Sequence, residues 1–121
     1  TSTRMGMGQI LYCPLAQGLL TGKYADGKIP EGSRAADPKS NEFIQRRMTE
    51  ENLARVARLQ SFAAARGWPL AALALAWVVR HEGVSAAIIG ATRPDHIVEN
   101  ARVDEIELSD ADLEVIASLL E

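Results

Sequence analysis

Two short apolar runs, residues 9–13 and 84–89, alternate with longer stretches of helical periodicity. Runs without polar alternation are typical of buried parallel strands, so we predict a strand over each and expect the second to be buried on both faces. Between them, the spacing of apolar positions predicts one helix over 41–66, ended by Gly67. A second helix is predicted over 69–80, and its apolar composition indicates that it is buried.

The sequence after the second strand predicts two more helices. Pro94 and Asp95 mark a helix start, because proline suits the first helical position and an acid suits the positive end of the helix dipole. Ser109 and Asp112 have the spacing of a capping box, with Asp in place of the usual Glu or Gln, and predict a closing helix. Residues 25–40, rich in glycine, proline and charge, predict a long loop. The order of strands and helices indicates an α/β fold.

Composition sets limits on the class of protein. The 121 residues are 47% apolar and 24% charged, as in ordinary globular proteins. A net charge of −3 without a basic cluster argues against a nucleic-acid partner. No apolar run approaches the length of a membrane span, so we expect no membrane insertion. Cys13 is the single cysteine, which excludes an internal disulfide and favours a cytoplasmic setting. Residues 1–8 show no period and predict a frayed tail or the end of a helix.

The stretch after the first strand has the residue types of an anion-binding loop. Pro14 ends the strand, Gly18 and Gly22 allow turns or a close approach to a ligand, and Lys23 is a charge suited to a phosphate. α/β proteins place ligands at the carboxyl ends of their strands, which favours phosphate binding here. An ordinary corner between strand and loop is the alternative, and it stays open because no Walker sequence is present.

Residues 14–24, PLAQGLLTGKY, closely resemble the loop after the seventh barrel strand of the aldo-keto reductases. The most similar branch includes the potassium-channel β subunits and many bacterial oxidoreductases. Residues 90–100, GATRPDHIVEN, resemble the family's loop and helix after strand eight, with residues 33–35 and 74–80 between them in family order. The resemblance covers only about the last third of the family's usual length. It implies that residues 1–121 are the C-terminal part of a single (β/α)₈ TIM barrel domain, which would self-associate or need a missing N-terminal barrel segment.

The resemblance also implies a site for NADP(H). Tyr12 matches an aromatic residue that stacks on the nicotinamide ring, and a barrel-core aromatic is the alternative. Cys13 stands where the family usually has Ser, which puts that hydrogen bond in doubt because a thiol is a poor donor. Lys23 matches a charge near the pyrophosphate. Arg93 has no match in the channel subunits, and His96 replaces a residue that is commonly Gln or Arg in the family, so these two are included for their chemistry. With them, the residues predicted to bind the cofactor are Tyr12, Cys13, Pro14, Leu15, Ala16, Lys23, Arg34, Gly90, Thr92, Arg93, His96, Glu99 and Asn100.

Several of these assignments have simpler alternatives. Arg34 matches an arginine that lies over the cofactor, with a spacing about one residue longer than in the channel subunits; otherwise it is a loop arginine at a rim. Arg93 suits a 2′-phosphate and His96 could contact that phosphate or adenine, but each could be a surface residue. Glu99 and Asn100 match the family's adenine-binding pair, on one helix face with His96.

The implied activity is that of an oxidoreductase that reduces aldehydes and ketones by hydride transfer. In the family, the catalytic tyrosine, lysine, aspartate and histidine come from earlier strands, so we predict that this chain alone is inactive. Tyr12 and Tyr24 belong to other positions. Three alternatives remain: a regulatory or interaction subunit like the channel β subunits, a truncated product without function, and an α/β interaction domain that only looks like a reductase.

Overall fold

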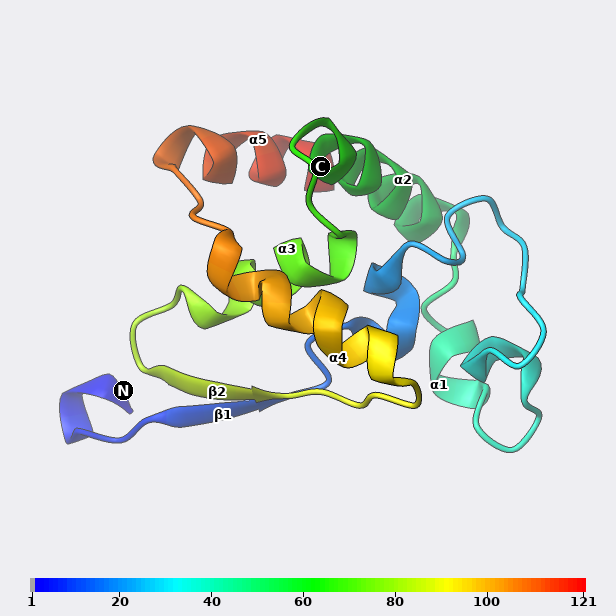
Figure 1. Cartoon of the computed structure of the whole chain (residues 1–121), viewed down its shortest axis with the longest axis horizontal. Helices are drawn as coiled ribbons and strands as arrows, with labels where there is room; N and C mark the ends of the chain where they lie inside the picture. Colours follow the sequence, from blue (N-terminus) through cyan, green and yellow to red (C-terminus); the bar gives the residue numbers. More distant parts are fainter. Residues whose placement is uncertain (1) are drawn as a thin grey trace.

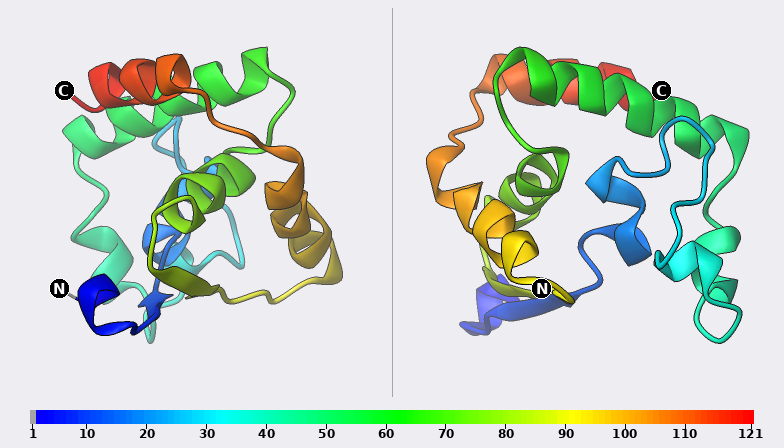
Figure 2. Two further views of the ribbon diagram at one scale, coloured as in Figure 1. Left: turned by 90° about the vertical axis from the view of Figure 1, so that its left-hand side faces the viewer. Right: turned by 45° about the vertical axis from the view of Figure 1, so that its right-hand side comes forward.

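Residues 2–121, which the computed structural model describes, form a pair of strands beneath two layers of helices (Figure 1). Thr1, the first residue of the predicted tail, lies outside the described residues. Both views of Figure 2 show the same order of layers, with α2 and α5 farthest from the strands and α3 and α4 between. In chain order, with η for 3₁₀ helices, the elements are η1 (Thr3–Met5), β1 (Gln9–Tyr12), η2 (Ala16–Thr21), η3 (Arg34–Ala36), α1 (Glu42–Gln45), α2 (Glu50–Ala65), α3 (Leu70–Val79), β2 (Val84–Ile88), α4 (Pro94–Ala101), η4 (Arg102–Glu105) and α5 (Asp110–Leu120).

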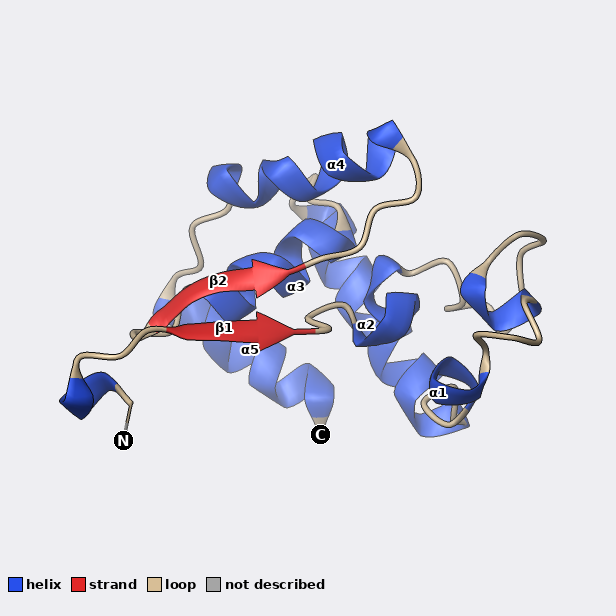
Figure 3. Cartoon of the chain, turned by 90° about the horizontal axis from the view of Figure 1, so that it is seen from below, coloured by secondary structure: helices blue, strands red, loops and turns tan. Residues whose placement is uncertain are grey.

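The two predicted strands form and pair in parallel (Figure 3). Tyr12 lies opposite Ile88, with one irregularity in register between Gln9 and Ile10. Each strand ends one residue earlier than predicted. At the first of these ends, Cys13 has a φ of 60°, which breaks the extended backbone. The pairing brings the loops that follow both strands to one edge of the sheet.

The strands are far more exposed than their apolar sequences predict. Ile10, Tyr12 and Ile88 expose 65%, 77% and 54% of their surface. The prediction that the second strand is buried on both faces is therefore wrong for the chain as described. α3 packs against β2, but no other strand joins the pair within residues 2–121. An apolar run cannot specify how many neighbours its strand has, and burial depends on those neighbours.

The main hydrophobic core lies among the helices. α3 is buried along most of its length, as its apolar sequence predicts, and contacts β2, α2, α4 and η2. Each large apolar side chain buried here stabilises the fold by about 1.5–3 kcal/mol. The buried members of this core are Leu19, Tyr24, Ala35, Ile44, Val56, Leu59, Phe62, Ala63, Leu70, Leu73 and Ile116.

The predicted single helix over 41–66 is two helices. α1 ends at Gln45. The backbone of Thr49 is extended, and the Thr49 hydroxyl accepts a hydrogen bond from the Asn52 N–H at 3.2 Å. Thr49 is therefore the N-cap of α2, a role that hydroxyl residues favour because they satisfy a free N–H of the first turn. The helix ends as predicted, with Gly67 at a φ of 69° just beyond it.

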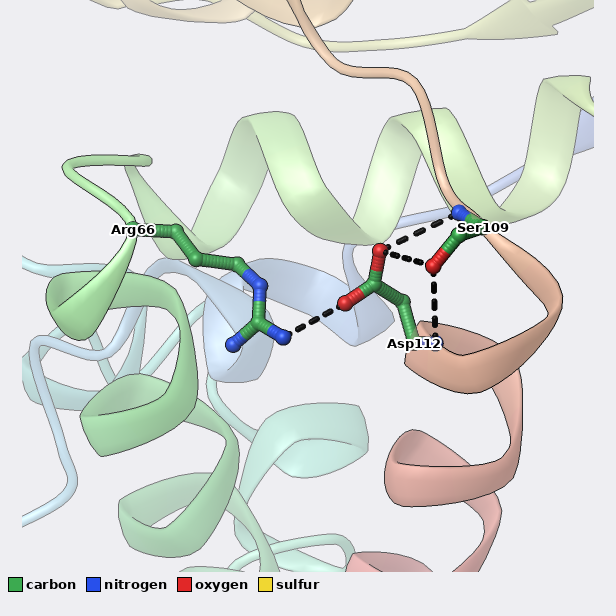
Figure 4. Close-up of polar contacts among 3 residues, drawn as sticks. All are labelled: Arg66, Ser109 and Asp112. Carbon is green, nitrogen blue, oxygen red and sulfur yellow. Dashed lines mark hydrogen bonds and ion pairs between the residues drawn. The ribbon is translucent and has the colours of Figure 1, made fainter.

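The two helices after β2 begin as predicted. Pro94 is the first residue of α4, and Ser109 caps α5 in a capping box with Asp112. The Asp112 N–H donates to Ser109 Oγ at 3.2 Å, and the Ser109 N–H donates to Asp112 Oδ2 at 3.1 Å. The other carboxylate oxygen of Asp112 pairs with Arg66 at the end of α2, which fixes α5 against that helix (Figure 4).

Candidate functional site

A cleft of about 770 Å³ opens where β1 and β2 end. Its walls are the loop after β1, the loop over residues 30–40, and the segment that runs from the end of β2 into α4. The parallel pairing explains this arrangement, because it places both carboxyl ends at the same edge. Its volume lies within the range of roughly 300–1,000 Å³ that is usual for small-molecule and cofactor sites.

The structure brings almost all of the predicted site residues together in this cleft. Ala16 is the exception, since it does not line the cleft although its neighbours do. The predicted residues in the wall are Tyr12, Cys13, Pro14, Leu15, Lys23, Arg34, Gly90, Thr92, Arg93, His96, Glu99 and Asn100.

Other residues of the wall were not predicted as site residues. Gln17 and Thr21 come from η2, and the loop over 30–40 contributes Glu31, Ser33 and Asp37 among others. Ser33 was visible in the sequence as part of the Ser-Arg-Ala match. Gln17 and Thr21 lie within residues 14–24, whose resemblance to the family's loop was seen, but neither was assigned a role. Glu31 and Asp37 carried no signal, because polar residues in a glycine-rich loop are as common on an ordinary surface.

The backbone after β1 is strained. Cys13, Ala16 and Gln17 have φ values of 60°, 49° and 63°, all in the left-handed region that side chains with a Cβ disfavour. This conformation costs roughly 1–2 kcal/mol per residue. Such strain persists only where surrounding contacts impose it, and it concentrates at functional sites. The corner after β1 is therefore held by its contacts in an unfavourable shape.

Two of the three cations in the wall are free of acidic partners. Among residues 2–121, neither Lys23 nor Arg34 forms an ion pair. Lys23 Nζ lies 5.3 Å from the centroid of the Tyr24 ring, and Arg34 Nη1 donates a hydrogen bond to Gln17 Oε1. Both cations can therefore receive an anion without displacing a carboxylate.

Arg93 is already paired. Its Nε and Nη2 donate to the two carboxylate oxygens of Asp95 at 2.9 and 2.7 Å. These hydrogen bonds hold the pKa of Asp95 below its ordinary value and raise the pKa of Arg93. A phosphate at Arg93 would share this guanidinium with Asp95.

The loop over residues 30–40 is anchored to the chain beyond η2. Tyr24 is fully buried, and its hydroxyl accepts a hydrogen bond from the Ala35 N–H at 3.3 Å. Nearby in sequence, the Ser33 hydroxyl oxygen is buried without a hydrogen-bond partner among the described residues. A buried polar atom usually has a partner, so this wall has an unsatisfied hydrogen-bonding group.

The α4 side of the cleft offers polar groups at a helix start. Arg93 is the N-cap of α4. His96 in the first turn and Glu99 and Asn100 about one turn further on line the cleft. Asn100 is 6% exposed, so its amide is held within the wall. Tyr12 also lines the cleft and is largely exposed.

Neither a metal-binding cluster nor a single membrane-spanning helix is found in the part of the chain that the structure describes. Within residues 2–121, no three His, Cys, Asp or Glu side chains gather in a way that would hold a metal ion. In the same part of the chain, no single helix is long and apolar enough to cross a membrane; α2 and α3 reach that length only together, and a bend of 95° separates them.

The chain belongs to the aldo/keto reductase family. The sequence pattern described as the Aldo/keto reductase family matches residues 2–121, which confirms the resemblance found in the sequence. The similar proteins include both potassium channel β subunits and reductases. A probable voltage-gated potassium channel subunit beta of Oryza sativa subsp. japonica is 40% identical over 101 residues, which are 84% of this chain and 31% of that protein. An L-glyceraldehyde 3-phosphate reductase of Escherichia coli (strain K12) is 39% identical over 99 residues, which are 80% of this chain and 28% of that protein.

A solved structure has a similar fold. The glycerol dehydrogenase AKR11B4 from Gluconobacter oxydans superposes with a TM-score of 0.73 at 27% sequence identity, over 98% of this chain and 36% of that one. The chain thus spans about a third of the length of the curated relatives it matches. Its mixed strand and helix architecture is that of a section of this family's fold.

Proposed function

We propose that this chain is the cofactor-binding C-terminal part of an aldo-keto reductase barrel, and that its cleft binds NADP(H). One observation carries the proposal: two segments far apart in the sequence, residues 12–23 and 90–100, meet at the carboxyl ends of two paired parallel strands. Phosphate-bearing ligands bind at such edges in α/β proteins. The exposed apolar side chains of β1 and β2 support a barrel in which further strands cover them.

The groups around the cleft fit a dinucleotide. Tyr12 offers a ring face to the nicotinamide, and Lys23 and Arg34 offer charges to the pyrophosphate without competition from a described carboxylate. The unpartnered Ser33 hydroxyl is a further group that a phosphate oxygen could satisfy.

The opposite wall suits the adenosine half. Gly90, Thr92 and Arg93 lie where the backbone enters α4, whose free N–H groups and dipole favour a phosphate. Glu99 and Asn100 follow on α4 and would bind adenine, with His96 beside them. The 2′-phosphate of NADP(H) would lie at Arg93, which supports NADP(H) over NAD(H).

The proposed reaction of the complete protein is reduction of an aldehyde or ketone, for which the bound cofactor supplies the hydride. The named relatives, an L-glyceraldehyde 3-phosphate reductase and a glycerol dehydrogenase, support a carbonyl–alcohol conversion. The family's catalytic tyrosine has no counterpart in this chain, so the 121 residues alone would bind cofactor without turning over substrate. Turnover of an aldehyde by the purified chain would contradict this part. We place the protein in the cytoplasm, consistent with a single cysteine.

The proposal is tested by titrating NADPH into the purified chain and following NADPH fluorescence. Asn100→Ala removes an amide from the wall and should weaken binding by about tenfold, the value of one or two hydrogen bonds. Gln45→Ala, on α1 outside the cleft, is the matched control and should bind like the wild type. A wild-type chain that is folded and does not bind NADPH would contradict the proposal.

A second candidate is a regulatory subunit. Two plant relatives described as probable voltage-gated potassium channel β subunits, from Oryza sativa and Arabidopsis thaliana, are 40% and 41% identical to this chain. In this alternative the cleft still binds the cofactor, but its occupancy biases a membrane partner. Co-purification with a channel protein, unchanged by Tyr12→Ala, would favour this candidate over the enzyme.

A further inference from the structure

Gln17 occupies a backbone position that disfavours its own side chain. Its φ and ψ are 63° and 22°, and it lies between Ala16 at a φ of 49° and Gly18 at a φ of 97°. Glycine adopts this conformation without steric cost, and asparagine does so more readily than glutamine. The backbone therefore does not favour a glutamine at this position, and the contacts of its side chain offset that cost.

The Gln17 side chain joins two walls of the cleft. Its Nε2 donates to Cys13 Sγ at 2.9 Å, and its Oε1 accepts from Arg34 Nη1. The orientation of the amide is fixed, because a guanidinium only donates and must therefore face the oxygen. We call this connection from Cys13 through Gln17 to Arg34 the Gln17 bridge.

The Arg34 guanidinium is held to the rest of the protein through this bridge. The backbone of its loop is tied down separately, through the hydrogen bond from the Ala35 N–H to Tyr24. The Arg34 guanidinium, by contrast, forms no ion pair within residues 2–121, whereas the Arg93 guanidinium donates two hydrogen bonds to the carboxylate of Asp95. The Arg34 guanidinium thus donates one hydrogen bond to Gln17, and its other N–H groups remain available to a ligand.

We propose that Gln17 is a positioning residue, which fixes the Arg34 guanidinium across the cleft and so slows release of a phosphate-bearing ligand. This inference rests on the proposed function, because it takes NADP(H) as that ligand. Gln17 acts through Arg34 and need not touch the ligand itself. A charged group held in place loses less freedom on binding, so the benefit appears as a lower dissociation rate.

The experiment is a stopped-flow measurement of NADPH release from the purified protein. Gln17→Gly removes the bridge and relieves the left-handed backbone, so it should raise the dissociation rate by about tenfold while the melting temperature stays equal or rises. Gln17→Met keeps the length of the side chain without its hydrogen bonds and should raise the rate by a similar factor. Gln45→Ala, outside the cleft, should leave the rate unchanged.

A double-mutant cycle separates positioning from a general structural role. Arg34→Met alone should raise the dissociation rate, and adding Gln17→Met to it should change the rate by less than about twofold, because the two residues act as one unit. If the increase in dissociation rate in the double variant equals the product of the increases in the two single variants, the inference is overturned. An unchanged rate in Gln17→Gly or Arg34→Met, or a fall in melting temperature that accompanies faster release in both Gln17 variants, would also overturn it. Failure of the wild type to bind NADPH would overturn the proposed function together with this inference; normal binding with unaltered Gln17 variants would overturn this inference alone.

Discussion

Arg66 and Asp112, 46 positions apart in the sequence, form an ion pair with 2.5 Å between Nη2 and Oδ1 (Figure 4). Arg66 ends α2 and also lies over the Phe62 ring, 3.8 Å from its centroid. Asp112 lies in the first turn of α5, where it also accepts hydrogen bonds from the N–H and the hydroxyl of Ser109. The helix dipole favours a cation at the C-terminal end of α2 and an anion in the first turn of α5, which is where these two charges lie. The same carboxylate therefore completes the cap of α5 and joins it to α2.

Removing the cap should destabilise the fold. Ser109→Ala deletes the oxygen that accepts from the Asp112 N–H, and loss of an N-cap of this kind costs about 1 kcal/mol. Urea unfolding followed by circular dichroism measures the change. Ser118→Ala is the control, because that exposed hydroxyl donates to a carbonyl of its own helix and should matter little. Equal losses in both variants would show that the cap has no special role.

The contribution of Asp112 should depend on pH. Hydrogen bonds from Ser109 and then the charge of Arg66 hold the pKa of Asp112 below its ordinary value. The folded protein therefore keeps this carboxylate ionised where the unfolded chain binds a proton, and the stabilisation is complete above the ordinary pKa of about 3.9. As the pH falls through the lower folded pKa, the stabilisation is lost.

Asp112→Asn tests this prediction. The difference in unfolding free energy between wild type and Asp112→Asn should be largest near pH 7 and should shrink below about pH 4. Urea denaturation at a series of pH values measures it. A difference that is constant from pH 7 to pH 3 would mean that the charge of Asp112 does not contribute.

Local signals allowed much of the helical structure to be predicted. The capping box at Ser109 and the start of α4 at Pro94 depend on residues within one turn, and both are confirmed. The break before α2 was missed although its signal is also local: Thr49 precedes Glu50 and Glu51, a sequence typical of a helix start. Apolar periodicity continued across the break and hid it.

Features that depend on distant residues could not be predicted in the same way. Ile10 and Ile88 are exposed because few elements cover their strands, and no property of the two runs reveals that. The gathering of predicted site residues could be anticipated, since parallel strands bring their carboxyl ends together. Gln17 escaped prediction because its significance depends on a left-handed backbone and on Arg34, 17 positions away.

Two glycines at and after the end of η2 should tolerate alanine differently. Gly22 and Gly27 have φ values of 82° and 76°, so a Cβ at either costs roughly 1–2 kcal/mol through the backbone. At Gly22 the new Cβ would also lie 3.0 Å from Gln60 Cδ, whereas at Gly27 nothing lies within 4 Å. Gly22→Ala should therefore cost up to about 1 kcal/mol more than Gly27→Ala in urea unfolding.

Gln60 provides the control for this comparison. In a Gln60→Ala background the crowding at Gly22 disappears, so Gly22→Ala and Gly27→Ala should then cost the same. If Gly22→Ala lowers the unfolding free energy of the wild type by less than Gly27→Ala does, Gln60 moves aside freely and crowding does not contribute to the cost of Gly22→Ala.

The ion pair between Arg93 and Asp95 should limit the preference for NADPH over NADH. Asp95→Asn removes the carboxylate that competes for the guanidinium, so Arg93 becomes freer to bind a 2′-phosphate. We expect the ratio of NADPH to NADH affinity to rise about threefold to tenfold in Asp95→Asn and to fall in Arg93→Leu, as expected for one charge-assisted hydrogen bond. Fluorescence titration with both nucleotides measures the ratio. An unchanged ratio in Arg93→Leu would mean that Arg93 does not contact the 2′-phosphate.

The most direct test of the claim that this cleft binds the cofactor is to locate the bound nucleotide. Titration of the ¹⁵N-labelled chain with NADP⁺, followed by amide chemical shifts, gives that location. We predict saturable shifts that concentrate at residues 12–23, 33–35 and 90–100, with α5 unaffected. Shifts confined to other elements, or a folded chain whose spectrum does not change, would contradict the assignment of this cleft as the cofactor site.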